Sequence, residues 1–146
     1  MPPDVWVILG DAQARKSSTI RALTGVYNSA EQDIQSTTRR LSMVWVQVPS
    51  LQEAKISRTA FQIKQGSRNY ILLNLRINSM TIYPDGLAYI QYFISQNWNI
   101  QEVVVMGRNT LPYTLPAGVP THFIPNSSTT PANENAHDIR QQWGWL

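Results

Sequence analysis

The chain opens with an apolar run, a short polar loop and a helical segment: Val5-Trp6-Val7-Ile8-Leu9, then Gly10-Asp11-Ala12-Gln13-Ala14-Arg15-Lys16-Ser17-Ser18, then Thr19-Ile20-Arg21-Ala22-Leu23-Thr24-Gly25. The first run is rich in β-branched and aromatic residues, which favour a strand. The last stretch predicts a helix, with Lys16 and Ser17 at its entrance. Strand, loop and helix in this order form the unit from which α/β folds are built.

Four further apolar runs follow, separated by helical patterns, and their continuous apolar character is typical of strands buried on both faces of a parallel sheet. The expected strands are Val5–Leu9, Met43–Val48, Tyr70–Leu75, Glu102–Met106 and Thr121–Pro125. The expected helices are Ser17–Thr24, Ser57–Lys64, Gly86–Asn97 and Ala132–Trp143. We therefore predict a single α/β domain over residues 1–146. It is a three-layer sandwich with a mostly parallel five-stranded sheet and helices on both faces.

Three polar segments separate these elements and are expected to be loops. Tyr27–Arg40 is rich in Ser, Thr and Gln, and indicates either an exposed loop or a frayed helix. Asn109–Val119 and Asn126–Pro131 carry several prolines. Such loops at one edge of an open α/β sheet are where ligands bind.

The composition excludes several classes of function. The chain has no cysteine, which rules out disulfides, thiol catalysis and cysteine-ligated metals. Its two histidines, His122 and His137, have no third partner nearby in the sequence, so we expect no zinc site. The net charge of +3 comes from scattered basic residues, and no basic tract argues for nucleic acid. No apolar run is long enough for a membrane span or a signal peptide, so we expect no membrane partner and a cytoplasmic location.

The opening loop resembles the phosphate-binding loop of the P-loop NTPases, G-x-x-x-x-G-K-[ST], in every position but one. Gly10 matches the first glycine, Lys16 and Ser17 match the final pair, and Arg15 stands where the second glycine would be. The resemblance implies a loop whose N–H groups surround a phosphate, with Lys16 on the terminal phosphates and Ser17 on magnesium. It also implies ATP or GTP with magnesium as ligand, and phosphoryl transfer or hydrolysis as the chemistry.

The resemblance has three departures. Glycine before the lysine lets the loop backbone approach the phosphates closely, and the side chain of Arg15 is expected to crowd them. The strand Tyr70–Leu75 offers Asn74 where these enzymes hold magnesium with an aspartate, which predicts weakened metal binding. The segment after Glu102–Met106 lacks the aspartate that reads guanine, so guanine specificity is not inferred.

The candidate site residues all belong to the loop or to the ends of the predicted strands. Arg15, Lys16, Arg76 and Arg108 meet at one edge of a parallel sheet and form a candidate anion site. Asp11, inside the loop, is the candidate catalytic carboxylate, and Asp85 is the second choice. The full set of expected ligand-binding residues is Gly10, Arg15, Lys16, Ser17, Ser18, Arg76 and Arg108, with Ser17 also the metal ligand.

Three functions remain open on the sequence. The first is a protein that binds a nucleotide or a phosphorylated small molecule through a degenerate phosphate loop. The second is a non-catalytic interaction or assembly protein that retains the fold, with a partner or a second copy meeting the apolar tail around Trp143 and Trp145. Docking of that tail on its own sheet is the favoured alternative for those tryptophans. The third is a small α/β enzyme acting on an anionic small molecule at the arginine-lined edge.

Overall fold

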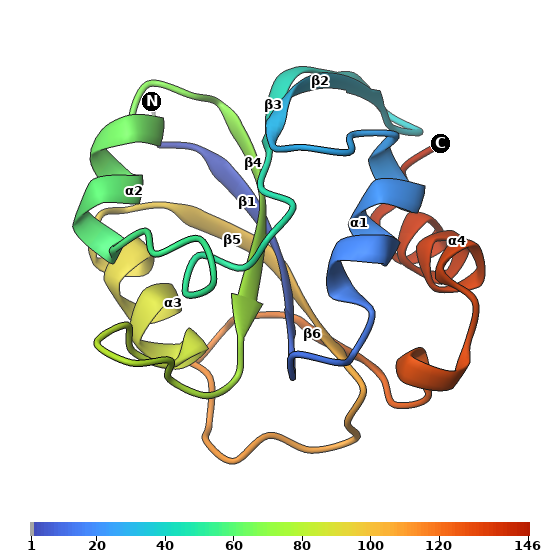
Figure 1. Cartoon of the computed structure of the whole chain (residues 1–146). Coiled ribbons are helices and arrows are strands. Elements are labelled where there is room, and N and C mark those ends of the chain that lie inside the picture. Colours follow the sequence, from blue (N-terminus) through green and yellow to red (C-terminus); the bar gives the residue numbers. More distant parts are fainter. Residues whose placement is uncertain (1) are drawn as a thin grey trace.

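The structure is a computed structural model that describes residues 2–146, and it forms an α/β sandwich (Figure 1). The strands are β1 (Asp4–Gly10), β2 (Ala30–Gln35), β3 (Arg40–Val46), β4 (Tyr70–Arg76), β5 (Asn99–Met106) and β6 (Thr121–Ile124). The helices are α1 (Lys16–Thr24), α2 (Arg58–Gln65), α3 (Gly86–Ser95) and α4 (Ala132–Trp143), with a short 3-10 turn at Ser127–Thr129.

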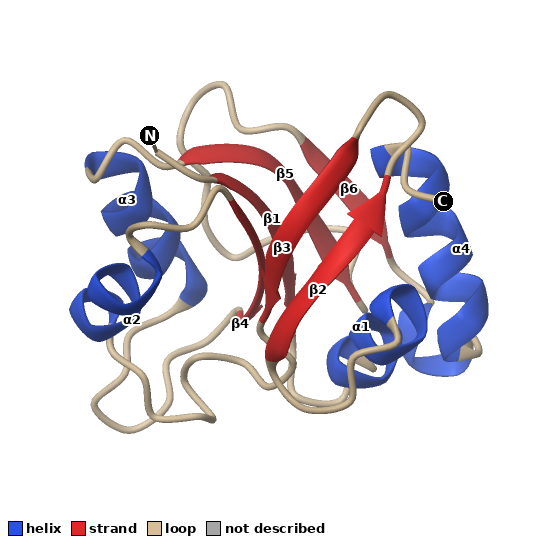
Figure 2. Cartoon of the chain, turned by 90° about the horizontal axis from the view of Figure 1, so that it is seen from above, coloured by secondary structure: helices blue, strands red, loops and turns tan. Residues whose placement is uncertain are grey.

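All strands belong to one sheet in the order β2-β3-β4-β1-β5-β6. β1 lies at the centre and pairs in parallel with β4 and β5, and β3 and β6 extend the parallel sheet on either side. Helices α2 and α3 cover one face, whereas α1 and α4 cover the other (Figure 2). The predicted α/β sandwich with a mostly parallel sheet is confirmed.

The sheet has six strands, and the prediction of five was wrong. The additional strand, β2, lies in the segment that we expected to be a polar loop or a frayed helix. It pairs antiparallel with β3 at the edge of the sheet, and only Ile34 among its residues is buried. An edge strand that faces solvent carries little apolar signal in its sequence, which is why its composition resembles that of a loop.

The core divides into two layers, one on each face of the sheet. β1 contributes to both, since successive side chains of a strand point to opposite faces. Trp6 and Ile8 pack with α1 and α4, whereas Val5, Val7 and Leu9 pack with α2 and α3. This double burial explains the unbroken apolar run that the sequence shows at the start of the chain.

The predicted helices are present with small shifts at their ends. Ser57 caps α2, as its serine predicts: its hydroxyl accepts a hydrogen bond from the Ala60 N–H at 3.1 Å. Asp85 lies just outside α3 and caps it through the Ala88 N–H at 2.9 Å. Within residues 2–146, no helix combines the length and the apolar composition that crossing a membrane would require.

The topology places one crevice at the carboxyl edge of the sheet. β1 leads into α1 on one face, whereas its neighbour β4 leads towards α3 on the opposite face. Two adjacent parallel strands whose connections leave to opposite sides create an opening between their loops, and this is where open α/β sheets bind ligands. The loop that resembles a phosphate-binding loop lies at this position.

Candidate anion-binding site

The loop after β1 turns sharply against β5. Gly10 ends the strand, and a side chain there would place its Cβ 2.8 Å from the Met106 carbonyl oxygen, so this position requires glycine. The Ala14 N–H donates to the Asp11 carbonyl at 3.1 Å, which closes a turn inside the loop. On its outer side, the buried Ser127 hydroxyl donates to the Ala14 carbonyl at 2.9 Å. The backbone of Ala14 is therefore held by two hydrogen bonds, one through its N–H and one through its carbonyl, just before α1 begins.

Arg15 adopts a left-handed backbone conformation, with φ 64° and ψ 29°. This region suits glycine and costs other residues about 1–2 kcal/mol. The loop thus keeps a backbone shape that glycine would favour, although the side chain is arginine. That side chain leaves the loop and donates from Nε to the Ser128 carbonyl at 2.9 Å.

Replacing Arg15 with glycine is expected to leave stability within about 1 kcal/mol of wild type. Relief of the left-handed strain is offset by the greater flexibility of glycine in the unfolded chain and by the lost hydrogen bond to Ser128. Chemical denaturation of Arg15→Gly and Arg15→Ala checks this, since alanine loses the same hydrogen bond without the relief. Equal free energies of unfolding for Arg15→Ala and Arg15→Gly would contradict a left-handed backbone at this position.

Lys16 is the buried cation of the site. Its side chain folds back under the loop, and Nζ donates to the carbonyls of Gly10 at 3.0 Å and Asp11 at 2.9 Å. Burial lowers the pKa of Lys16 from 10.5 to about 8, the carboxylates of Glu53 and Asp11 partly oppose this shift, and the guanidinium of Arg76 adds to it. In the described chain no acid lies within ion-pair distance of Lys16.

The lowered pKa of Lys16 predicts a rise in stability with pH. Between about pH 8 and 10.5 the unfolded chain holds more protons at this lysine than the folded chain, so the free energy of unfolding increases across this window. Burial raises the pKa of Tyr89 and Tyr113 from 10.0 to about 12, which acts in the opposite direction above pH 10. Urea denaturation between pH 8 and 10 is therefore the informative range. The rise should vanish in Lys16→Met and persist in Lys64→Met, and a rise that survives in Lys16→Met would contradict the assignment.

The first turn of α1 presents free backbone donors. No side chain caps this helix, and the N–H groups of Lys16, Ser17 and Ser18 have no acceptor within residues 2–146. Ser18 is exposed beside them. Uncapped N–H groups at the positive end of a helix attract anions.

The residues present do not fit the magnesium ion that the resemblance implies. Ser17 Oγ donates to the Val48 carbonyl at 3.0 Å. Asn74 is buried at the position of the aspartate that holds magnesium in the P-loop NTPases. Its Nδ2 donates to the same Val48 carbonyl at 2.7 Å and lies 3.4 Å from Ser17 Oγ. Asn74 Oδ1 is buried without a partner within residues 2–146, but it is a neutral ligand, and the Ser17 hydroxyl beside it is already engaged with the Val48 carbonyl. Nor does any group of three or more acidic or histidine side chains suited to a metal occur within residues 2–146.

Arg15, Arg76 and Arg108 all lie at the carboxyl edge of the sheet, and their side chains have different partners. Arg76 pairs with Gly10 across β1 and β4, and the Gly10 carbonyl accepts a hydrogen bond from Lys16 Nζ, so Arg76 and Lys16 adjoin the same residue. Arg15 turns outward to Ser128, whereas Arg108 Nε donates to the Thr110 carbonyl at 3.2 Å. Arg108 also approaches the carboxylate of Asp11, the candidate catalytic residue, with 3.9 Å between Nη1 and Oδ2.

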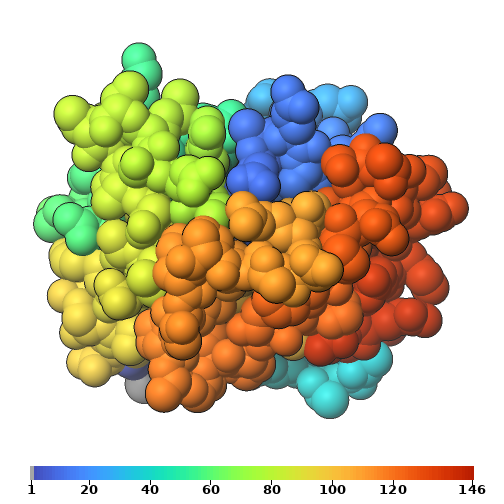
Figure 3. Space-filling model, turned by 90° about the horizontal axis from the view of Figure 1, so that it is seen from below, coloured from blue at the N-terminus to red at the C-terminus, as the bar shows by residue number. Residues whose placement is uncertain are grey.

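Two features of this edge had no signal in the sequence. Gln52 is fully buried and brackets the backbone of Arg76: its Oε1 accepts from the Arg76 N–H at 3.0 Å and its Nε2 donates to the Arg76 carbonyl at 3.1 Å. A cavity of about 210 Å³ opens beside the loop and is lined by Asp11, Gln13, Ala14, Gly107 and Ser128. Seen from this edge, the blue surface of the loop lies between the yellow-green segment after β4 and the orange segments after β5 and β6 (Figure 3).

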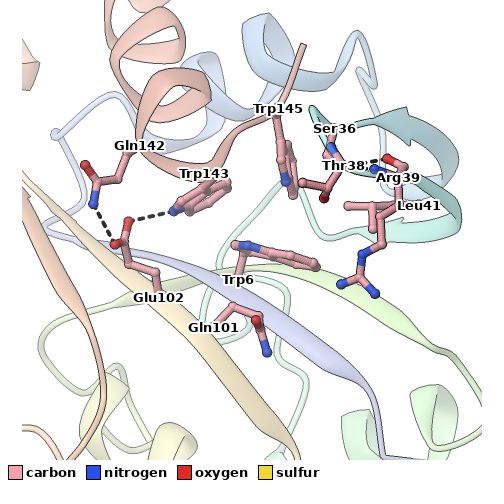
Figure 4. Close-up of a pocket in the computed structure, with 10 residues that line it drawn as sticks. All are labelled: Trp6, Ser36, Thr38, Arg39, Leu41, Gln101, Glu102, Gln142, Trp143 and Trp145. Carbon is pink, nitrogen blue, oxygen red and sulfur yellow. Dashed lines mark hydrogen bonds between the residues drawn. The ribbon is translucent and has the colours of Figure 1, made fainter.

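The C-terminal tryptophans lie far from this loop along the sheet and pack within the molecule. Trp145 is 4% exposed, and its ring centroid lies 5.2 Å from that of Trp6 and 4.9 Å from that of Trp143. The carboxylate of Glu102 accepts hydrogen bonds from Trp143 Nε1 and Gln142 Nε2, each at 2.8 Å (Figure 4). These contacts confirm that the tail docks on its own sheet.

No protein-family model, curated protein or solved structure matches this chain.

Proposed function

We propose that the chain binds a phosphate-containing anion, such as a nucleotide or another phosphorylated small molecule, in the loop between β1 and α1. The observation that carries this proposal is the combination of a buried lysine with the uncapped first turn of α1. Lys16 and the N–H groups of Lys16, Ser17 and Ser18 are donors at one end of one loop. Donors of this kind at the positive end of a helix suit a phosphate.

The position of the loop in the topology supports the same proposal. It lies at the crevice where the connections of β1 and β4 leave to opposite faces. The cavity beside the loop, of about 210 Å³, offers space for the part of a ligand that extends beyond the phosphate. Its lining includes Gln13 and Ser128, which carry amide and hydroxyl groups for hydrogen bonding.

A thermal-shift titration with ATP, GTP, ADP and pyrophosphate tests the proposal. Ligand at one hundred times its dissociation constant stabilises the folded state by about 2.7 kcal/mol, which raises the midpoint visibly. We expect the shift in wild type and in Lys64→Met, and its loss in Lys16→Met. An unchanged midpoint with all four ligands would refute the proposal.

The second candidate function is a non-catalytic interaction protein that keeps the fold. Asn74 at the position of the metal-binding acid and Arg15 at the position of the loop glycine both favour it. This candidate predicts that the molecular mass measured by light scattering rises with protein concentration. It also predicts that phosphate ligands leave the melting midpoint unchanged. An enzyme acting at the arginine-lined edge has less support, because the guanidinium groups of Arg15 and Arg108 already hydrogen-bond to backbone carbonyls.

A further inference from the structure

We propose that the loop holds its anion without a divalent metal ion, and that Arg76 supplies the positive charge that a metal would otherwise supply. This inference rests on the proposed function, since it concerns how the same loop binds its ligand. The ligand class is a free oxyanion of the phosphate type, not a metal complex of it.

The metal position is already filled by donors and by the protein backbone. Ser17 Oγ and Asn74 Nδ2 both donate to the Val48 carbonyl, at 3.0 and 2.7 Å. To use the Ser17 hydroxyl, a cation would have to displace it from the Val48 carbonyl, and the further acceptor that Asn74 offers is its neutral Oδ1, which is buried without a partner within residues 2–146. A neutral amide contributes no charge to offset the dehydration of magnesium, which gives up its water reluctantly.

Arg76 stands on the neighbouring strand with part of its hydrogen-bonding capacity unused. Within residues 2–146 its Nε is buried without a hydrogen-bond partner, and its Nη1 hydrogen-bonds to the sulfur of Met80, at 3.5 Å. No acid lies within ion-pair distance of it in the described chain. Two hydrogen bonds of the buried Gln52 amide fix the backbone of Arg76 at the end of β4. A guanidinium is always charged and forks onto phosphate oxygens, so Arg76 suits the role.

Two carboxylates also face this region and do not alter the conclusion. The Glu53 carboxylate is exposed and accepts from the Ser50 hydroxyl at 2.8 Å, whereas Asp11 approaches Arg108. Neither lies within ion-pair distance of Lys16 or Arg76. Lys16 and Arg76 both adjoin Gly10, through a hydrogen bond to its carbonyl and through strand pairing, and an oxyanion bound between two positive charges would relieve their repulsion.

Isothermal titration with tripolyphosphate in EDTA and in magnesium chloride tests the inference. We expect binding in EDTA, with magnesium leaving the affinity unchanged or weaker. Arg76→Gln should weaken binding by about tenfold to a hundredfold, the usual cost of a lost charged hydrogen bond. Arg58→Gln, an exposed arginine on α2, is the matched control and should bind as wild type does.

The outcomes separate this inference from the proposal on which it rests. Binding that requires magnesium would overturn the metal-free site and leave the anion-binding function standing. Equal affinity of wild type and Arg76→Gln in EDTA would overturn the role of Arg76. Absence of binding in both buffers would overturn the anion-binding function itself. Circular dichroism of Arg76→Gln shows that the variant is folded before its affinity is compared.

Discussion

Trp145→Ala is expected to destabilise the protein by about 3–5 kcal/mol, the usual cost of removing a large aromatic side chain from a core. Trp145 joins elements that are distant in the sequence. Its ring packs edge-on against Trp6 of β1, and its backbone forms a bridge with Ser36 beyond β2. Alanine keeps the backbone bridge, so the loss measures the removal of the buried ring together with the cavity that it leaves.

Urea denaturation followed by circular dichroism measures this effect. The neighbouring Leu146 is 70% exposed, so Leu146→Ala serves as the control and should change stability by less than about 0.5 kcal/mol. A loss below about 1.5 kcal/mol for Trp145→Ala would mean that the tail is not part of the core. If wild type is monomeric and Trp145→Ala associates, the docked tail covers an apolar surface in the wild-type protein.

Asn74→Asp is expected to cost about 3 kcal/mol at pH 8, because a buried charge without a partner costs more than a lost neutral hydrogen bond. Asn74 is 1% exposed, and its amide donates to the Val48 carbonyl at 2.7 Å. An ionised aspartate has no hydrogen to donate and would face that carbonyl with a negative charge. Restoring the acid expected in a metal-binding loop thus damages the fold.

The loss in Asn74→Asp should depend on pH with a defined sign. Burial and the nearby carbonyl raise the folded pKa of such a carboxyl above its unfolded value, so the folded state binds the proton more tightly. Stability relative to wild type therefore falls as pH rises through that window and recovers at low pH. Denaturation at pH 5 and pH 8 measures the difference. Asn109→Asp, at an exposed position, is the control, and a loss equal at both pH values would contradict the buried environment.

The sequence predicted the parallel part of the fold because burial on both faces leaves a direct trace in it. β1 contains an unbroken apolar run, β4 contains one interrupted only by Asn74, and the ends of α4 were predicted correctly. β2 was missed because an edge strand with only Ile34 buried has no such trace. Its existence depends on pairing with β3, which a local pattern does not express.

The candidate site was predictable only in part, for a related reason. Lys16 and Ser17 were located because a helix entrance after a buried strand is a local motif. The hydrogen-bond partner of each side chain depends on the tertiary structure: Arg15 donates to the carbonyl of Ser128, and Ser17 donates to that of Val48. Gln52, which fixes the end of β4, gave no signal because a lone glutamine in a polar stretch is indistinguishable from a surface residue.

The most direct measurement of the central proposal is an NMR titration of the ¹⁵N-labelled chain with pyrophosphate. Binding at the loop predicts saturable shifts at the backbone amides of Lys16, Ser17 and Ser18, because these N–H groups have no acceptor among residues 2–146. The shifts should disappear in Lys16→Met while the rest of the spectrum stays dispersed. Saturable shifts confined to other elements, or none at any residue, would contradict the account.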